Sequence, residues 1–425
     1  VLENKLFGMN VAFDNNYLLV SSMTSKVIVD KFDNYVTENT GNVFLFYCTD
    51  FLKCELIESF SHPNPQLNDG YGISVDMDWP FIVIGAPETG KDFNNNDRID
   101  DDEKTVGAVF VYNCSSGTCE LIETIESLSP VYGEYFGSSL ALSESKLVIG
   151  NWRETVDGLY GVGGAYLYSC TSSGCELQHT IPNPSPAEKE YFGLDIDMDN
   201  EKLIVAAPHA EVNGVEGAGI VYYYDCSSNI CNLVDTIENP IPNDGRVIDK
   251  FGSNVSISGT RIVTSAPITD STNYSVYSNE GKLYLYDCKT SNCNLVDTIE
   301  NPTPNLKEQH EEIFDDFGHS GLVLLGNYLL VGDSGVAIDV DGSGKIEDDE
   351  KSIGEAYLYD CSNNNCTLIE ILKNPVDERG SSFGISVAMV SQNKIAVGAH
   401  NSNLVYLFTN VVYTGFQGIE RSGSF

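Results

Sequence analysis

Basic residues are scarce in this sequence. Lys and Arg together number 23, against 62 Asp and Glu, which leaves a formal net charge of −39. A surface of this sign repels the phosphates of nucleic acids and of anionic lipids, so neither is expected as a partner. No run of about 18 apolar residues occurs, so we expect no membrane span in this segment.

Recognisable catalytic motifs are also missing. The six His are scattered, and the sequence contains no HExxH, no GxSxG and no phosphate-binding loop. Carboxylates are so numerous that no pair of them stands out as a general acid and base. We therefore predict a non-catalytic protein. The apolar share of 42% and the charged share of 20% are nevertheless typical of a chain that folds around a core.

No cysteine is left over from a regular pairing. The 12 Cys form six close pairs, five with the spacing C-x4-C and the first with C-x5-C. Zinc sites need four converging ligands, whereas each pair here stands alone. We predict six local disulfides, each worth about 2 kcal/mol in the chain-entropy model, and an extracellular or cell-surface location. The predicted pairs are Cys48–Cys54, Cys114–Cys119, Cys170–Cys175, Cys226–Cys231, Cys288–Cys293 and Cys361–Cys366.

Two further features bear on secretion, and neither establishes it. The chain begins at Val1 rather than Met, and we interpret it as a processed or excised segment. Asn-x-Ser/Thr triplets provide four candidate glycosylation sites, although chance alone gives a few in an Asn-rich chain. The acceptors are Asn113, Asn254, Asn273 and Asn365.

Internal repetition is the dominant feature of the sequence. An aromatic residue followed by Gly recurs seven times, at steps of 64, 65, 56, 59, 66 and 66 residues. Such self-similarity indicates a repeat fold, although a length of 425 residues alone would suggest two to four domains. The pairs are Phe7-Gly8, Tyr71-Gly72, Phe136-Gly137, Phe192-Gly193, Phe251-Gly252, Phe317-Gly318 and Phe383-Gly384.

Each unit carries four segments that are typical of strands. In the second unit, an alternating segment (73–77) is followed by an apolar run that ends in small residues (83–87). An aromatic segment (109–112), the Cys pair and a fourth segment (121–125) come next, before a linker rich in Asn and Pro. No unit shows apolar residues at i, i+3 and i+4 over a stretch long enough for a helix.

Four strands in each of seven units predict an all-β fold, a seven-bladed β-propeller of four-stranded antiparallel blades. We expect a single domain over residues 1–425, with blades that start near residues 7, 71, 136, 192, 251, 317 and 383. A β-solenoid would repeat at shorter periods, and two stacked sandwiches would not give seven equal units. The seventh unit lacks a Cys pair, and its blade is completed either by C-terminal residues or by a strand from Val1–Leu6.

The repeated motif resembles a known family. Phe-Gly, a strand, Gly-Ala-Pro (clearest at 85–87) and a Gly before an aromatic strand together resemble the FG-GAP repeat. The resemblance covers essentially the whole chain and implies the seven-bladed propeller of integrin α subunits. Other proteins of this kind include fungal propeller lectins and extracellular phospholipases, so the resemblance indicates architecture more firmly than function.

Two acidic inserts share the spacing of an EF-hand calcium loop. They cover residues 92–103 in the second unit and 339–350 in the sixth. Both place oxygen-bearing side chains at loop positions 1, 3, 5, 9 and 12, and the position-7 carbonyl adds a ligand. We predict two structural Ca²⁺ sites, because Ca²⁺ takes 6–8 hard oxygens. The candidate ligands are Asp92, Asn94, Asn96, Arg98, Asp100 and Glu103, and Asp339, Asp341, Ser343, Lys345, Glu347 and Glu350, with Arg98 and Lys345 acting through their carbonyls.

The two inserts differ at position 6, where the loop turns sharply. The sixth unit has Gly344 there, whereas the second has Asp97, a departure that would weaken binding. The family resemblance implies ligands from about positions 1 to 9, which leaves the roles of Glu103 and Glu350 open. The alternative interpretation of both inserts is a solvated acidic loop without a metal.

These observations favour an extracellular, calcium-binding propeller. We expect a non-catalytic adhesion, protein-interaction or structural assembly module of a cell-surface or fibre protein. Its partners would be a protein or glycan ligand, or further copies of the chain in an extracellular assembly. The alternatives are a lectin-like propeller that binds carbohydrate and, in third place, a secreted hydrolase on a propeller scaffold.

Overall fold

The structure is a computed structural model. It describes residues 3–29, 35–49, 53–65, 68–93, 105–242, 249–268, 281–304, 316–338, 350–375, 380–409 and 416–419. The chain divides into two compact units, Val1–Leu194 and Asp195–Phe425, and each is described by itself.

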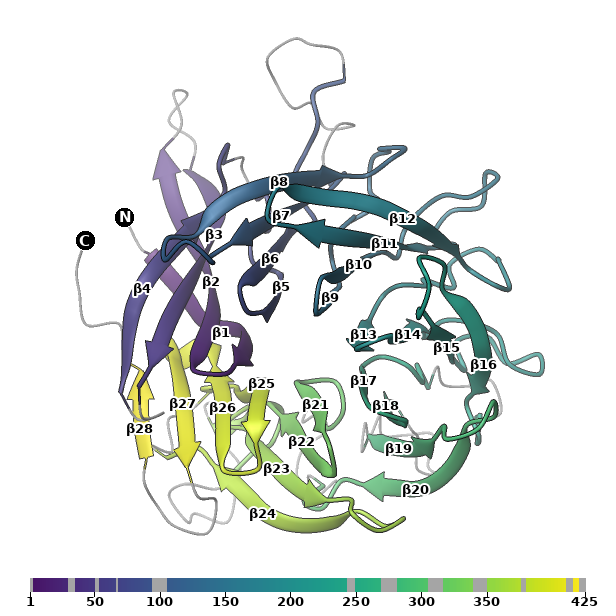
Figure 1. Ribbon diagram of the computed structural model, residues 1–425. Coiled ribbons are helices and arrows are strands. Elements are labelled where there is room, and N and C mark those ends of the chain that lie inside the picture. Colours follow the sequence, from purple (N-terminus) through teal and green to yellow (C-terminus); the bar gives the residue numbers. More distant parts are fainter. Residues whose placement is uncertain are drawn as a thin grey trace. The chain divides into compact units, whose positions relative to one another are not determined.

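Unit 1 consists of three four-stranded antiparallel sheets, each with its strands in chain order (Figure 1). The strands are β1 Glu3–Asp14, β2 Tyr17–Val29, β3 Tyr35–Cys48 and β4 Cys54–Ser61; β5 Ser74–Asp78, β6 Phe81–Ala86, β7 Ala108–Asn113 and β8 Glu120–Glu126; and β9 Leu140–Ser143, β10 Lys146–Asn151, β11 Gly164–Thr171 and β12 Gly174–Pro182.

Unit 2 consists of four sheets of the same kind. The strands are β13 Ile196–Asp199, β14 Lys202–Ala207, β15 Ile220–Asp225 and β16 Asn232–Glu238; β17 Val255–Ser258, β18 Arg261–Ala266, β19 Lys282–Asp287 and β20 Asn294–Glu300; β21 Leu322–Leu325, β22 Tyr328–Asp333, β23 Glu355–Asp360 and β24 Thr367–Lys373; and β25 Phe383–Ser391, β26 Lys394–Ala399, β27 Leu404–Thr409 and β28 Phe416–Ile419.

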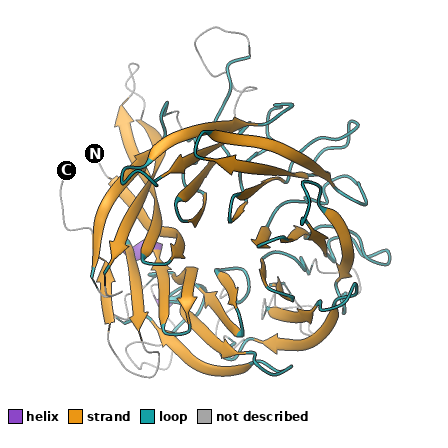
Figure 2. Cartoon of the chain, in the orientation of Figure 1, coloured by secondary structure: helices purple, strands orange, loops and turns teal. Residues whose placement is uncertain are grey.

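The predicted fold class is confirmed: seven successive four-stranded antiparallel sheets are the blades of a seven-bladed β-propeller. Helix in the described ranges is limited to short 3₁₀ turns such as His400–Ser402 (Figure 2). No helix of the described residues is long and apolar enough to cross a membrane. That the chain forms one domain over residues 1–425 stays a prediction.

The structure decides between the two ways of completing blade seven. The C-terminal strand β28 pairs with β27, with Val405 opposite Ile419. The N-terminal strand β1 pairs with β2 in blade one, with Leu6 opposite Met23. Blade seven is therefore built from C-terminal residues, and residues 3–6 belong to blade one.

The core lies between successive blades and is centred on the aromatic rings of the Phe-Gly pairs. The rings of Phe136 and Tyr166, on the third strand of the same blade, meet edge to face with centroids 5.7 Å apart. Val109 and Val111 of the preceding blade belong to the same buried cluster. Such aromatic pairs add about 0.5–1.5 kcal/mol to the free energy that burial itself supplies, so the Phe136 ring stabilises both its own blade and the one before it.

A glycine in each of the first six blades lets the Phe-Gly or Tyr-Gly pair of the next blade approach closely. The Phe192 amide donates to the Val162 carbonyl over 3.3 Å, which brings the Phe192 carbonyl against Gly163. A Cβ added to Gly163 would lie 2.0 Å from that oxygen, and Gly163 has a φ of +82°. Gly354 stands in the same relation to Phe383 in unit 2, with a φ of +86°. Only glycine meets both demands, which explains why the motif contains Gly before the aromatic strand.

Carboxylates on the first strands also join neighbouring blades. The Asp76 carboxylate of β5 accepts from the Leu142 amide of β9 over 2.7 Å. In unit 2, the Asp197 carboxylate of β13 accepts from the Ile257 amide of β17 over 2.8 Å. Hydrogen bonds to charged groups are worth about 1.5–3 kcal/mol each, so part of the acidic composition stabilises contacts between blades.

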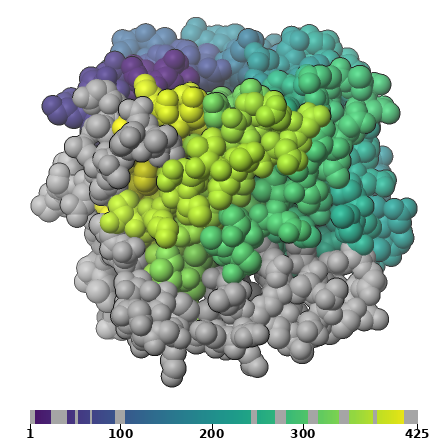
Figure 3. Space-filling view, turned by 90° about the horizontal axis from the view of Figure 1, so that it is seen from below, coloured from purple at the N-terminus to yellow at the C-terminus, as the bar shows by residue number. Residues whose placement is uncertain are grey.

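All six predicted disulfides are present. Each closes the hairpin between the third and fourth strands of its blade. The amide of the first Cys donates to a carbonyl in the turn between the first two strands, as Cys226 does to Glu201 over 2.7 Å. The hairpins also contact the preceding blade: the Asp297 carboxylate of β20 in blade five accepts from the Cys366 amide, just before β24 in blade six, over 2.7 Å. Figure 3 shows the green and yellow-green atoms of this part of unit 2 side by side on the surface.

The contact between Gly163 and Phe192 provides a test of how the blades are joined. We expect Gly163→Ala to lower the free energy of unfolding by at least about 3 kcal/mol, because the added Cβ clashes with backbone and not with a movable side chain. Urea unfolding followed by circular dichroism measures this change.

Gly158→Ala is the matched control, because Gly158 has a similar φ of +84° with no atom within 4 Å of an added Cβ. This variant should lower the free energy of unfolding by only about 1 kcal/mol, the cost of placing an alanine in a left-handed backbone conformation. Equal losses in the two variants would contradict a role for the close contact.

Candidate functional site

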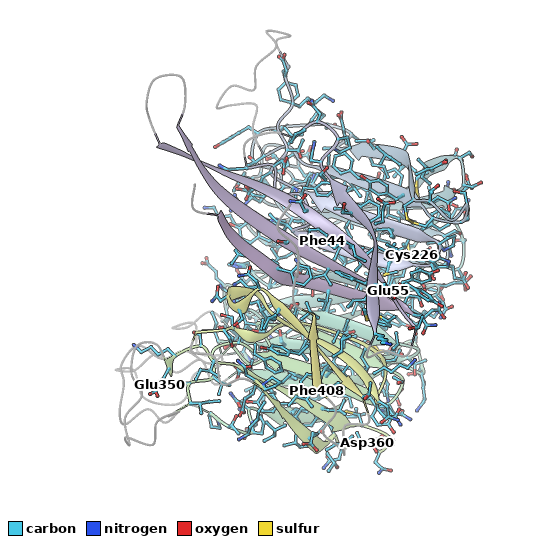
Figure 4. All side chains as sticks on the ribbon, turned by 90° about the vertical axis from the view of Figure 1, so that its left-hand side faces the viewer. Phe44, Glu55, Cys226, Glu350, Asp360 and Phe408 are labelled. Atoms are coloured by element: carbon cyan, nitrogen blue, oxygen red, sulfur yellow. A yellow bond between two sulfur atoms is a disulfide. The ribbon has the colours of Figure 1, made fainter. Side chains whose placement is uncertain are left out.

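Ten of the twelve predicted metal ligands lie outside the described residues, so the two calcium sites stay predictions. Among the described parts of the chain, no three His, Cys, Asp or Glu side chains are grouped so that they could hold a metal ion. Only Asp92 and Glu350 are described. Asp92 is half-buried and Glu350 is fully buried beside the base of its insert (Figure 4). The ten others are Asn94, Asn96, Arg98, Asp100, Glu103, Asp339, Asp341, Ser343, Lys345 and Glu347.

The two acidic inserts leave and re-enter their blades in the same way. In blade two, the Thr89 carbonyl accepts from the amides of Val106 and Gly107 over 3.0 and 2.9 Å. In blade six, the Val336 carbonyl accepts from two consecutive amides, those of residues 353 and 354, over 3.0 and 3.1 Å. Both inserts therefore connect the second and third strands of a blade from an equivalent base.

The same connection is a tight hairpin in blades three and four. Val156 and Leu159 exchange backbone hydrogen bonds of 3.1 and 2.9 Å across Asp157 and Gly158, which both have positive φ. Residues 212 and 215 pair in the same way in blade four. The long inserts of blades two and six are thus additions to a short connection, which indicates that they serve a purpose other than joining strands.

The candidate glycosylation sites differ in accessibility. Asn365 is exposed, whereas Asn113 is buried and accepts from the Ser115 amide over 2.9 Å. The Asn254 amide donates to the carbonyls of Gly318 and His319 in the next blade. Asn273 lies outside the described residues. A glycan on Asn113 or Asn254 would disturb these contacts, so Asn365 is the accessible acceptor among the three described.

A cluster of aromatic rings around Arg153 was not predicted from the sequence. The Arg153 guanidinium carbon lies 4.2 Å from the ring centre of Trp152 and 4.6 Å from that of Tyr135. The Tyr191 ring meets Trp152 edge to face at 4.9 Å. These residues come from three segments of unit 1: the loop before β9, the connection after β10 and the linker after β12. Cation–π contacts of this kind contribute about 0.5–2 kcal/mol and fix the guanidinium in place.

The signal that could have revealed this cluster is a break in the repeat. The run that reads Gly-Ala-Pro at 85–87 reads Gly-Asn-Trp-Arg at 150–153 in the third unit. Asn151 and Trp152 thus stand where the second unit has Ala86 and Pro87, and Arg153 follows them. The sequence shows the exchange, but it does not show that the loop before β9 folds back to cover the new side chains.

A buried acidic group lies beneath these rings. Glu134 is buried and accepts hydrogen bonds from the Ser127 hydroxyl, over 2.9 Å, and from the Val131 amide. Burial raises the pKa of Glu134 to about 7, and the neighbouring Glu154 adds to the rise. Burial also raises the pKa of Glu154, whose carboxylate accepts from the Tyr166 hydroxyl.

The Asn151 side chain completes this group. It is fully buried, and it lies close enough to Glu134 to lower the pKa of that carboxyl. Neither its amide nitrogen nor its oxygen has a hydrogen-bond partner of normal geometry. An unsatisfied buried polar group costs about 1–3 kcal/mol, so blade three carries a local cost in stability here.

The corresponding acid of the next repeat is satisfied. Glu190, also two residues before a Phe-Gly pair, accepts from the Asn183 side chain over 2.7 Å and from the Ala187 amide over 3.3 Å. Asn183 begins an Asn-Pro linker, and Asn239 holds Asp249 in the same way over 2.9 Å. The third unit, with Ser127 in place of that Asn, departs from this arrangement.

The comparison with known families agrees with the geometry. The model of the FG-GAP repeat matches residues 240–286, which contain Phe251-Gly252, the small-residue run of β18 and Gly281. The other six units repeat the same motif, and the seven units form seven blades with the same strand order. The chain is an FG-GAP repeat β-propeller. No curated protein matches its sequence.

Several solved structures are similar to this chain in fold. The β-propeller domain of the Trilobed protease from Pyrococcus furiosus is 12% identical, with a TM-score of 0.48 over 98% of this chain and 96% of that one. Sqt1 of Chaetomium thermophilum is 10% identical, with a TM-score of 0.46 over 96% and 82%. An acylaminoacyl peptidase from Pyrococcus horikoshii is 10% identical, with a TM-score of 0.47 over 98% and 52%.

Glu134 should make stability depend on pH. Its folded-state pKa of about 7 lies above the usual 4.5, so ionisation of Glu134 lowers the free energy of unfolding. This loss of stability is absent below about pH 4.5, grows up to about pH 7 and is constant at higher pH. Glu134→Gln should therefore raise the free energy of unfolding at about pH 8, by at most about 3 kcal/mol, and change it little at about pH 4.

Urea unfolding at the two pH values measures this difference. Glu188→Gln is the control, because Glu188 lies in the same unit with its side chain 56% exposed. A gain for Glu134→Gln that is equal at both pH values would show that ionisation of Glu134 is not its cause.

Proposed function

We propose that this FG-GAP propeller is an extracellular, non-catalytic module for adhesion, protein interaction or structural assembly in a cell-surface or fibre protein, and that it binds two Ca²⁺ ions. The six disulfides support the location, because local disulfides of this kind persist in oxidising compartments. A rigid scaffold that carries variable loops at one end of its blades is also a common arrangement for binding.

The observation that carries the calcium proposal is the equivalence of the two acidic inserts. They share the oxygen spacing of a calcium loop, and they leave blades two and six from the same backbone positions. An insert that only joined strands would need neither the spacing nor the length, as the hairpin at Asp157 and Gly158 shows. The ions would neutralise carboxylates that otherwise repel one another on a chain with a net charge of −39.

Calcium removal tests this proposal. We expect chelation with EGTA to lower the thermal midpoint of calcium-loaded protein, since an ion that binds only the folded state stabilises it by about 2.7 kcal/mol at 100 times its dissociation constant. Differential scanning calorimetry measures the shift, and isothermal titration counts the sites.

Two variants locate the effect. Asp339→Asn combined with Asp341→Asn should remove one of the two sites and most of its share of the shift. Asp270→Asn, in the fifth-unit insert that lacks the spacing, should leave both sites intact. An unchanged midpoint after EGTA, in protein shown to start calcium-loaded, would refute the proposal.

A lectin-like function is the second candidate, and the cluster around Arg153 is the observation that favours it. Aromatic rings beside charged and polar side chains are the groups that bind sugars, by stacking and by hydrogen bonding. Specific, saturable binding on a glycan array that is lost in Trp152→Ala would favour this alternative. Turnover of phospholipid or glycoside substrates by the purified chain would contradict the non-catalytic proposal.

A further inference from the structure

Exposed apolar side chains gather on two loops of unit 1. The loop before β9 (127–135) and the hairpin after β10 (156–161) carry five of them, each at least 36% exposed. They are Leu128, Val131, Tyr132, Leu159 and Tyr160.

Both loops are tied to the cluster around Arg153. The Tyr135 ring, at the end of the first loop, contacts the Arg153 guanidinium. The hairpin is held by the linker after β12, where the Lys189 amide donates to the Tyr160 carbonyl over 2.9 Å and the Tyr191 ring contacts Trp152. We refer to the two loops with Trp152 and Arg153 as the Arg153 surface.

Arg153 is fixed in position but makes no ion pair with any described residue. Its guanidinium is held by the rings of Trp152 and Tyr135, and its buried Nε has no hydrogen-bond partner in the part of the chain that the structure describes. The adjacent carboxylate, that of Glu154, is engaged by the Tyr166 hydroxyl instead. On a chain with 62 acidic residues, a half-buried, pre-positioned arginine that has no carboxylate partner among the described residues is suited to an anion supplied by a partner.

The composition of the surface favours a protein as the source of that anion. Trp, Tyr and Arg are the residue types that dominate binding energy at protein interfaces. Leu128, Val131 and Leu159 add aliphatic area, which buries well against apolar side chains but offers no ring for a sugar to stack on. A polyanion such as a nucleic acid or a sulfated glycan would be repelled by the net charge of −39.

We propose that the Arg153 surface binds a segment of a partner protein that presents one carboxylate between apolar side chains, with Arg153 receiving the carboxylate in a bidentate pair. This inference rests on the proposed interaction function, and it names the site and the chemistry of the partner. The surface adjoins the blade-two insert, because the Tyr135 amide donates to the carbonyl of Thr105, the first described residue after the insert, over 3.1 Å.

The chain contains a natural reporter for this test. It has two Trp, so Trp79→Phe leaves Trp152 as the single tryptophan, which is excited selectively at wavelengths that tyrosine does not absorb. The substitution keeps an aromatic ring to stack on Tyr17, whose ring centre lies 3.5 Å from that of Trp79. The probe is N-acetyl-Leu-Glu-Tyr-amide, compared with N-acetyl-Leu-Gln-Tyr-amide and with free glucuronate. We expect the Glu peptide to change Trp152 fluorescence saturably, with a dissociation constant of about 1–10 mM, and the Gln peptide to bind at least about tenfold more weakly.

Variants on the same background identify the group that binds. Arg153→Met should weaken binding of the Glu peptide about 30-fold, as expected for a central interface arginine. Lys146→Met removes the same charge from the opposite end of β10 and should leave binding unchanged. The thermal midpoint of each variant shows that it is folded.

The outcomes separate the possible ligands. Equal binding of the Glu and Gln peptides, no saturable change with the Glu peptide, or no effect of Arg153→Met would each overturn the proposal. Glucuronate that binds more tightly than the Glu peptide would overturn it in favour of an acidic saccharide. Each titration is run with Ca²⁺ and with EGTA, which separates the peptide-binding proposal from the calcium proposal. If the peptide still binds and EGTA does not change the thermal midpoint of the protein, only the calcium sites are refuted.

Discussion

The structure depends on the close approach of backbone between neighbouring blades, where the carbonyl of one Phe-Gly pair rests on a glycine of the blade before it. At Gly163 and Gly354 an added Cβ would lie about 2 Å from that oxygen. The approach places each aromatic ring in the core shared by two blades and lets first-strand carboxylates such as Asp76 reach the next blade. Disulfides and loops are added to blades that this contact has already joined.

The acidic composition has a structural use as well as a cost. Asp76 and Asp197 accept backbone amides of the following blade, so these charges are placed where donors converge. Burial opposes the ionisation of some of these carboxylates. It raises the pKa of Asp195 to about 7, although the Asp195 carboxylate accepts a hydrogen bond from the Val255 amide over 2.7 Å. Calcium in the inserts would offset repulsion of the same origin at the end of the blades that carries them.

The sequence predicted the fold well because each element repeats its signals seven times. The Phe-Gly pairs, the alternating strands and the six Cys pairs are local patterns, and each has one arrangement that satisfies it. The Arg153 surface was not predicted, since it depends on how the loop at 127–135 folds onto Trp152, and that contact leaves no periodic trace. The calcium loops are recognisable by spacing alone, and ten of their twelve candidate ligands lie outside the described residues.

The third unit is where local rules are broken, and the breaks occur together. Its small-residue run contains Asn151 and Trp152 and is followed by Arg153, its buried acid Glu134 lacks the Asn that satisfies Glu190, and the Asn151 side chain has no hydrogen bond of normal geometry to a described residue. The departures at Glu134 and Asn151 cost stability, and a fold with seven equivalent units could have avoided them by keeping the motif. These departures coincide with an exposed aromatic and basic surface. Such a coincidence is expected at a functional site, where residues are kept because they improve binding although they do not improve folding.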